Sequence, residues 1–212
     1  MPRYNKIKKA FVAIGIACIF LCSMLHRASA QNNDYKWLKT ITSSRNLQLE
    51  KFEKGLSFSV YPALLLHPTA FIATGLIKKD TSLIKTGLCI VTGIALNAAL
   101  TYGLKYTINR ERPYVSHPQI IALAIENSSS MPSGHTSGAF NLATSLTLAY
   151  PKWYVAAPSY LWASGVAYSR MYIGVHYPSD VFIGALLGSG TAWLNYYLNK
   201  KYFKPRLRCR NR

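Results

Sequence analysis

The sequence predicts an all-α protein, a polytopic membrane helix bundle of five transmembrane helices preceded by a signal peptide or a sixth helix. Five apolar segments follow residue 59, each near the length that crosses a bilayer as a helix. Of the 212 residues, 50% are hydrophobic and only 15% are charged. Soluble domains normally carry about 25% charged residues. The length fits one domain, and the long apolar runs exclude a disordered chain.

Residues 1–30 have the pattern of a secretory signal. Four basic residues precede the apolar run Ala10–Leu25, and Ala28-Ser29-Ala30 forms a small-residue cleavage site before Gln31. The apolar run is long for a signal peptide and short for a span of about 20 residues. An uncleaved signal anchor is therefore the alternative. Whether the signal is cleaved or kept as an anchor, the chain after residue 30 starts outside the cytoplasm.

Residues 31–59 form an amphipathic exterior segment in which apolar and basic side chains are mixed. Such a segment can lie on the membrane surface, where its cations meet anionic headgroups. The alternative is an ordinary helix packed on the domain. The main domain, residues 60–198, contains the apolar segments at about 60–77, 83–104, 134–150, 154–174 and 181–198. Small residues recur in them, as in Gly184–Thr191, and these let membrane helices approach closely.

Lysine and arginine set the predicted orientation, since 25 basic residues face only 7 acidic ones. Most of the basic residues lie before the apolar run Ala10–Leu25, in two of the predicted hairpins and in the tail 199–212. An N-terminus inside places all of these in the cytoplasm. The protein is then a multi-pass inner-membrane protein with the loops 105–133 and 170–180 facing the periplasm. Topology accounts for the basic tail, so we expect no nucleic-acid partner.

The first polar segment at the periplasmic side is Lys105–Pro113. Lys105 ends a predicted membrane helix and Arg112 follows seven residues later, so both converge above the bilayer. The planar guanidinium fork matches phosphate oxygens, and lysine adds a point charge. Interfacial snorkelling is the structural alternative. Arg110 is interpreted as a solvated loop cation, with contact to a second phosphate as the alternative.

The second segment, Met131–Ser137, opens an apolar helix. Ser133 suits the N-cap, and Gly134 lets a ligand approach the backbone. Free N–H groups at a helix N-terminus bind anions readily. His135 then stands in the first turn beside such an anion. A plain capping turn with an interfacial histidine is the alternative.

The third segment, Ser169–Asp180, contributes Arg170, His176 and Asp180. Pro178 suits the first turn of the following helix. Asp180 lies four residues after His176 and can accept a hydrogen bond from one ring nitrogen, which leaves the lone pair of the other nitrogen free. Histidine can itself attack phosphorus. A carboxylate favoured by the helix dipole is the alternative reading of Asp180.

Together the three segments provide what phosphoryl transfer needs. Cations neutralise the equatorial oxygens, and helix N–H groups add neutral donors. A neutral histidine can attack in line while a protonated one assists the leaving oxygen. The predicted cations are Lys105, Arg112 and Arg170; the neutral donors are near Ser133 and Gly134; His176 is the nucleophile and His135 the general acid.

Metal-independent chemistry is predicted because the acidic residues are too sparse for a magnesium or two-metal site. No cofactor is expected. The carboxylates on the outer side are dispersed over loops: Asp34, Glu50, Glu53, Glu111, Glu126 and Asp180.

The three segments match in order K-x6-RP, PSGH and SR-x5-H-x3-D, and the sequence resembles the type 2 phosphatidic acid phosphatase (PAP2) superfamily over roughly residues 60–198. The resemblance implies an all-helical bundle and a phosphatase that forms a phosphohistidine. It implies phosphate contacts from the same three cations, Ser133 and Gly134, with His135 as the acid, His176 as the nucleophile and Asp180 as its partner.

A site at the bilayer surface suits a lipid phosphate substrate, with the membrane bilayer as the other partner and no obligatory protein partner evident. The compact chain is similar to bacterial lipid A phosphatases, and lipid A is the first expectation. Undecaprenyl diphosphate and phosphatidylglycerol phosphate phosphatases share the motifs. A vanadium-dependent haloperoxidase and a non-enzymatic lipid-binding protein rank below them.

Overall fold

The structure is a computed structural model that describes residues 28–202. Most of the predicted signal, residues 1–27, and most of the basic tail lie outside the described residues. Within them the chain is helical, and the all-α prediction is confirmed. The helices are α2 (Ala28–Ser43), α3 (Leu47–Phe58), α4 (Val60–Ile77), α5 (Thr81–Ile108), α6 (Pro113–Ser116), α7 (Gly134–Ala149), α8 (Trp153–Tyr172) and α9 (Pro178–Tyr202).

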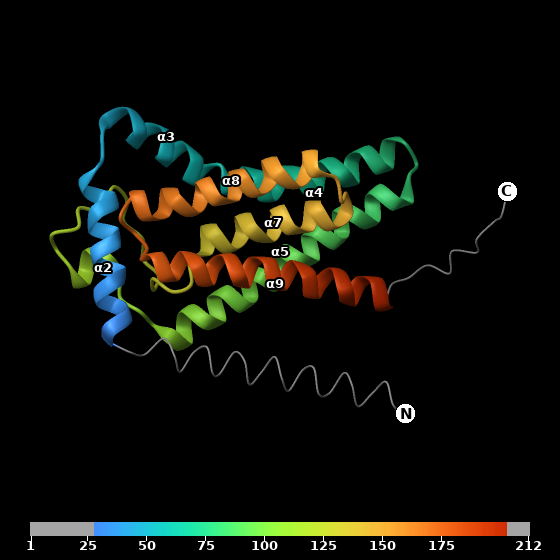
Figure 1. Ribbon diagram of the computed structural model, residues 1–212. Helices are drawn as coiled ribbons and strands as arrows, with labels where there is room; N and C mark the ends of the chain where they lie inside the picture. Colours follow the sequence, from blue (N-terminus) through green and yellow to red (C-terminus); the bar gives the residue numbers. More distant parts are fainter. Residues whose placement is uncertain (1–27, 203–212) are drawn as a thin grey trace, which may run out of the picture.

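Figure 1 shows an elongated bundle in which α4, α5, α7, α8 and α9 run roughly along one axis. Each of the five predicted apolar segments corresponds to one of these helices. Helix α7 is central and packs against α9, α8 and α5. Asp80 caps α5, its carboxylate accepting from the N–H groups of Ser82 and Leu83. The left-handed Asn109 (φ 45°) ends α5 and turns the chain into the long loop that precedes α7.

The contact between α7 and α9 depends on glycine. A Cβ at Gly188 would lie 2.1 Å from the Ser137 carbonyl oxygen, and one at Gly184 would lie 2.8 Å from the Ser133 carbonyl oxygen. The two backbones therefore touch at two points about one helical turn apart, where a larger residue would clash. The small-residue stretch in α9 thus brings the start of α9 against the start of α7.

Buried amides and hydroxyls join the bundle core across α5, α7 and α9. The Asn141 amide donates to the backbone oxygens of Gly93 and Gly188, both at 3.3 Å, and to the Thr191 hydroxyl at 3.0 Å. Thr191 in turn donates to the Asn97 side-chain oxygen at 3.2 Å. Interhelical hydrogen bonds of this kind hold membrane helices together where apolar burial against lipid contributes little.

The outer face of the bundle is apolar. Many large hydrophobic side chains of α4 and α5 are exposed, as a lipid environment requires: Leu65, Leu66, Leu76, Ile77, Leu88, Val91 and Leu100. In the described part of the chain, two helical stretches, Leu47–Ile77 (α3 with α4) and Thr81–Ser116 (α5 with α6), are long and apolar enough to cross a membrane. The other three helices of the bundle do not meet that criterion, so the predicted number of spans stays a prediction.

Residues 31–59, predicted to be an amphipathic exterior segment, form most of α2 and all of α3. Helix α2 lies across one end of the bundle and contacts α8 and α9, with Leu38 fully buried. For α2 the domain-packed alternative is therefore the observed one. Helix α3 packs on α8 and meets α4 at Ser59, while Leu47 and Phe52 stay exposed.

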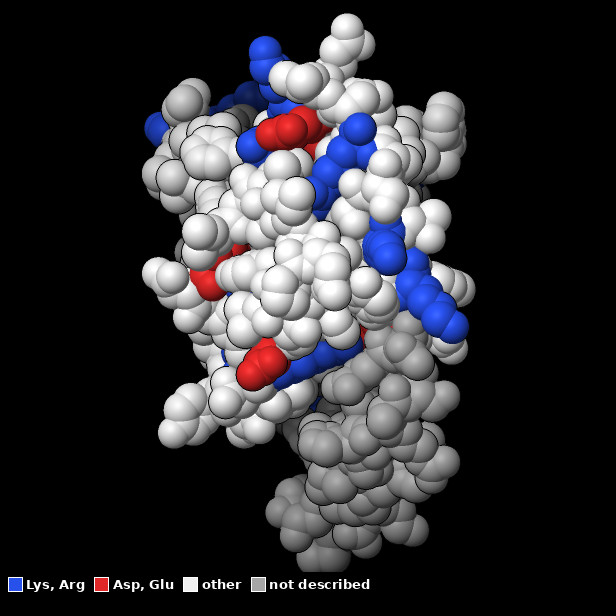
Figure 2. Space-filling model, turned by 90° about the vertical axis from the view of Figure 1, so that its left-hand side faces the viewer, with Lys and Arg blue, Asp and Glu red and all other residues white. Residues whose placement is uncertain are grey.

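The two ends of the bundle are formed by different loops and helix ends. The long loop before α7, the end of α8 and the start of α9 gather at the end covered by α2, whereas the α4–α5 and α7–α8 turns lie at the opposite end (Figure 1). Figure 2 looks onto the α2 end, where Lys and Arg side chains are spread over the surface and acidic side chains lie beside several of them. All three predicted polar segments are thus at one end.

Candidate active site

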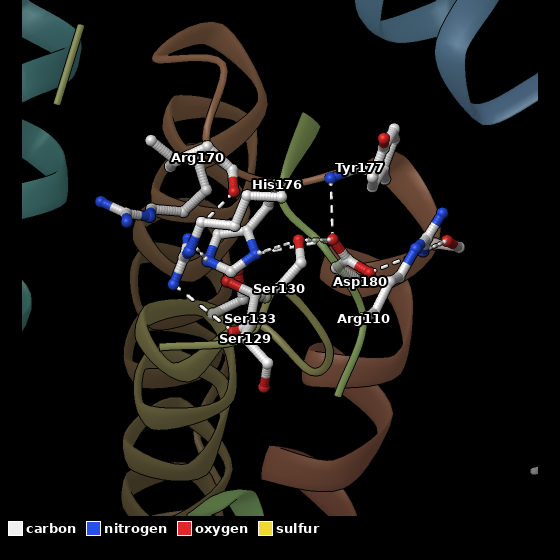
Figure 3. Close-up of polar contacts among 12 residues, drawn as sticks. Arg110, Ser129, Ser130, Ser133, Arg170, His176, Tyr177 and Asp180 are labelled. Carbon is white, nitrogen blue, oxygen red and sulfur yellow. Dashed lines mark hydrogen bonds and ion pairs between the residues drawn. The ribbon is translucent and has the colours of Figure 1, made fainter. Parts of the chain in front are cut away.

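The predicted site residues converge in a buried polar cluster beneath the α2 end (Figure 3). Lys105 and Arg112 come from the end of α5 and the following turn, Arg170 from the last turn of α8, and His176 from the short α8–α9 connection. These four side chains are almost fully buried, between 1% and 7% exposed. Three cations and a histidine at such depth are costly to desolvate and are characteristic of function.

The Glu126 carboxylate bridges two of the cations. Its Oε2 accepts from Arg112 Nη2 at 3.2 Å, and its Oε1 pairs with Arg170 Nη2. Burial raises the pKa of Glu126, but the charges of Arg170 and Arg112 outweigh burial and hold that pKa below its ordinary value. The negatively charged Glu126 carboxylate therefore lies between the two guanidinium groups. A phosphate group has the charge and the oxygen geometry to bind there.

Backbone carbonyls and hydroxyls orient the cations. Arg112 Nε donates to the Ser128 carbonyl oxygen at 2.7 Å, and Arg112 Nη1 donates to the Val175 carbonyl oxygen at 3.0 Å. Lys105 Nζ donates to the carbonyl oxygen of Ser129. The Arg170 Nη1 donates to the Ser57 hydroxyl at 2.6 Å, and its Nε is buried without a partner among the described residues. The polar loop before α7 therefore sets the direction of two cations.

His176 is 1% exposed and stands beside Arg112, whose Nη1 lies 3.4 Å from the imidazole Nε2. Burial lowers the pKa of His176 to about 4, against the opposing effect of Asp180. The ring is therefore neutral near pH 7. With its proton on Nδ1, it directs the Nε2 lone pair toward the cation cluster.

Asp180 is fully buried at the start of α9, and its Oδ2 lies 3.6 Å from His176 Nδ1. This separation is longer than a hydrogen bond, so the predicted direct bond is not made. Instead, Oδ2 accepts from the Ser130 hydroxyl at 2.5 Å and from the Tyr177 N–H at 2.9 Å. Asp180 therefore has both of the roles considered from the sequence. It caps the start of its own helix, and it also faces the His176 imidazole.

The start of α7 supplies the remaining predicted residues. Ser133 is the N-cap as expected, but its side chain makes no capping bond and instead accepts from the Thr136 hydroxyl at 3.0 Å. The Ser133 side chain therefore leaves the first N–H groups of α7 uncapped. A Cβ at Gly134 would meet only Thr101, at 3.9 Å, so the backbone is open to a ligand. The His135 ring packs edge-on against Tyr61, with centroids 4.9 Å apart.

Sequence reasoning missed two residues of this cluster. Ser130 is fully buried, and its hydroxyl lies 3.5 Å from His176 Nδ1 while it bonds Asp180. Glu126 lies between the arginines. Both precede the PSGH segment, and the run Asn127–Ser130 was the available signal, since four polar residues before a membrane helix need a polar environment.

Arg110 was interpreted wrongly as a solvated cation. Its side chain is only 13% exposed and forms ion pairs with Asp34 and Asp180. Among the residues the structure describes, no group of three or more His, Cys, Asp or Glu side chains has the arrangement of a metal site.

A family model of the PAP2 superfamily matches residues 86–204, which includes all three polar segments. The chain belongs to the PAP2 superfamily. Among curated relatives, it is 30% identical over 128 residues to a lipid A 4'-phosphatase of Bacteroides thetaiotaomicron, covering 55% of this chain and 57% of that protein. It is 33% identical over 118 residues to an undecaprenyl-diphosphatase of Sulfolobus acidocaldarius, covering 52% and 54%. The chain thus spans about half the length of the curated relatives it matches.

Two solved structures share the fold. A transmembrane PAP2-type phosphatidylglycerolphosphate phosphatase of Bacillus subtilis aligns with a TM-score of 0.74 and 24% identity, covering 93% of this chain and 98% of that one. Aquifex aeolicus LpxE aligns with a TM-score of 0.65 and 26% identity, covering 76% and 93%. The two apolar helical stretches of the chain support a membrane location.

Proposed function

We propose that this PAP2 protein is a membrane lipid phosphatase that works through a phosphohistidine on His176. The observation that carries the proposal is the buried convergence of Lys105, Arg112 and Arg170 around a neutral histidine. Such a cluster needs an anionic ligand, and a neutral imidazole beside a bound phosphoryl group can attack phosphorus. Membership of the PAP2 superfamily supports the same chemistry.

In the proposed reaction, His176 Nε2 attacks the phosphorus in line, and the bond from phosphorus to the lipid oxygen breaks. His135 gives its proton to that oxygen, and the dephosphorylated lipid leaves. Water then attacks the phosphohistidine, His135 takes a proton from it, and inorganic phosphate is released. Asp180 stabilises the positive charge that develops on the imidazole.

The cations and the start of α7 stabilise the transferring group. Arg112 and Arg170 neutralise the equatorial oxygens once phosphate displaces the Glu126 carboxylate, and Lys105 adds a third positive charge. The open N–H groups at Ser133 and Gly134 supply neutral donors. The proposed catalysis uses protein groups alone and involves no metal ion.

Lipid A is the proposed substrate, with the site at the periplasmic face of the inner membrane. The relative named lipid A 4'-phosphatase supports this choice. Undecaprenyl diphosphate and phosphatidylglycerol phosphate are the alternatives, supported by the names of other relatives. A haloperoxidase or a non-enzymatic lipid-binding protein ranks below these.

The test is mass spectrometry of lipid A from a Gram-negative host that expresses the intact chain, His176→Ala or His67→Ala. His67 is the matched control because it is exposed on α4, where Nδ1 contacts the Ala63 carbonyl oxygen at 2.8 Å. Loss of one phosphate is expected with the wild type and His67→Ala only. Fragmentation of the product would locate the phosphate position.

Two other outcomes would change the proposal. An unchanged lipid A spectrum with inserted protein moves the substrate to undecaprenyl diphosphate or phosphatidylglycerol phosphate, which purified enzyme would then be given directly. Phosphate release by His176→Ala at the wild-type rate would refute the phosphohistidine mechanism.

A further inference from the structure

A chain of ion pairs continues from Asp180 away from His176. Arg110 lies on the far side of the carboxylate (Figure 3), and its Nη1 donates to Asp180 Oδ1 at 2.7 Å. Its Nη2 donates to Asp34 Oδ2 at 2.9 Å. The guanidinium carbon lies 4.1 Å from the centroid of the Tyr177 ring, at cation–π distance. The side chains of Arg110 and Asp34 are 13% and 11% exposed and that of Asp180 is fully buried, and largely buried ion pairs persist only where the geometry satisfies both charges.

Arg110 fixes the orientation of the Asp180 carboxylate. Because Arg110 takes Oδ1, the other oxygen is left to Ser130, the Tyr177 N–H and the side facing His176. The Arg110 carbonyl oxygen also accepts the Ser130 N–H at 2.7 Å. One residue therefore holds both groups that face the imidazole Nδ1, the carboxylate through its side chain and the serine through its backbone.

Asp34 adjusts the charge of this arrangement. Arg110 alone would neutralise Asp180, whereas the two carboxylates and one guanidinium together keep a net negative charge behind the histidine. That charge matters when the imidazole becomes positive during attack. Asp34 also accepts the Ser179 N–H at 3.1 Å and the Ser179 hydroxyl, which attaches α2 to the start of α9. Asp34 lies outside the residues that the family model matches.

We propose that Arg110 and Asp34 are positioning residues that hold the His176–Asp180 pair in its reactive geometry, with α2 contributing one of them. The inference rests on the proposed phosphatase function. It gives the amphipathic segment before the family domain a role in the chemistry. Neither residue touches the phosphate; both act through Asp180.

The experiment compares purified full-length Arg110→Ala, Arg110→Lys and Asp34→Asn with the wild type, in detergent micelles. Phosphate release is measured on a lipid phosphate that the wild type hydrolyses, with kcat and KM determined separately. Glu111→Gln is the matched control, because Glu111 is exposed next to Arg110 and, within residues 28–202, accepts a hydrogen bond from the Ser116 hydroxyl alone. The melting temperature of each variant is recorded alongside.

Arg110→Ala is expected to lower kcat about 100-fold and Asp34→Asn about 10-fold. Removing the hydrogen-bond partners of metal-binding residues lowers activity by about 10–100-fold, and we expect the same range for residues that orient Asp180. KM should stay within about 2-fold, since the phosphate contacts are intact. Arg110→Lys should recover about 10-fold over Arg110→Ala, because lysine still reaches one carboxylate. Glu111→Gln should match the wild type. Asp34→Asn keeps the side-chain size and remains informative if Arg110→Ala does not fold.

The two proposals fail in different ways. If the wild type releases no phosphate from any lipid phosphate, or His176→Ala remains active, the phosphatase proposal fails. If the wild type is active and His176→Ala is not, wild-type kcat in both Arg110→Ala and Asp34→Asn overturns the positioning role. A loss that appears only in KM and melting temperature, with no recovery by Arg110→Lys, overturns it as well.

Discussion

Replacing Gly188 by alanine tests whether the contact between α7 and α9 builds the site. The added Cβ would lie 2.1 Å from the Ser137 carbonyl oxygen and 2.9 Å from the Asn141 nitrogen. An ordinary carbon–oxygen contact is about 3.3–3.6 Å, so the helices must separate by roughly 1.2–1.5 Å there. Because both partners are backbone or backbone-linked atoms, rotation of a side chain cannot relieve the clash.

The cost follows from this displacement. Overpacking of a tight contact costs about 1–3 kcal/mol. The separation also breaks the Asn141 bonds to the Gly188 carbonyl oxygen and to Thr191. Interhelical bonds in membrane proteins contribute about 0.6 kcal/mol each, so the expected loss of unfolding free energy is about 2–4 kcal/mol. The same movement pulls Ser133 from Asp180, whose carbonyl oxygen accepts the Ser133 N–H at 3.1 Å. A misplacement of about 1 Å lowers turnover by about 100-fold.

The assay pairs unfolding of the micelle-bound protein by SDS titration with phosphate release. Gly190→Ala is the matched control, because the residue is in the same helix and a Cβ there meets no atom within 4 Å. We expect Gly190→Ala to be neutral or slightly stabilising, since alanine favours the helix. Equal unfolding free energies and equal turnover for the two variants would refute the reasoning.

Three further predictions concern the chemistry. Since burial lowers the pKa of His176 to about 4, the acid limb of kcat/KM should lie near pH 4, where protonation removes the attacking lone pair, and loss of the His135 proton adds an alkaline limb; an acid limb near pH 6.5 would contradict this. Glu126→Gln removes the carboxylate that competes for Arg112 and Arg170, so inorganic phosphate should inhibit about 10-fold more strongly, a gain of about 1.4 kcal/mol; an unchanged inhibition constant would speak against competition. Excess EDTA should leave turnover unchanged, and its loss would require a metal ion.

The helices and the residues of the three polar segments were predictable from local sequence. Apolar runs of membrane length and the cap at Asp80 are properties of short stretches of chain. The spacing from Lys105 to Arg112, and from His176 to Asp180, likewise identifies groups that one helix end brings together. Such features are visible in the sequence because the chemistry and the helix period act over a few residues.

The contacts between distant segments required the tertiary structure. Arg110 resembled a solvated loop cation because its partner Asp34 is 76 residues away. Ser130 gave no distinct signal among the neighbouring serines, yet in the structure its hydroxyl donates to the Asp180 carboxylate. Burial of His176 among groups from distant segments, such as Arg112 and Ser130, determines its neutral state.

The sequence by itself therefore determined the helical class, the family and the set of chemical groups, which are encoded by composition and short spacing. The tertiary structure alone decided which carboxylate neutralises which cation and how far His176 stands from Asp180. The physical reason is that the energy of a buried charge depends on all the groups around it, and these come from segments that are far apart in the chain.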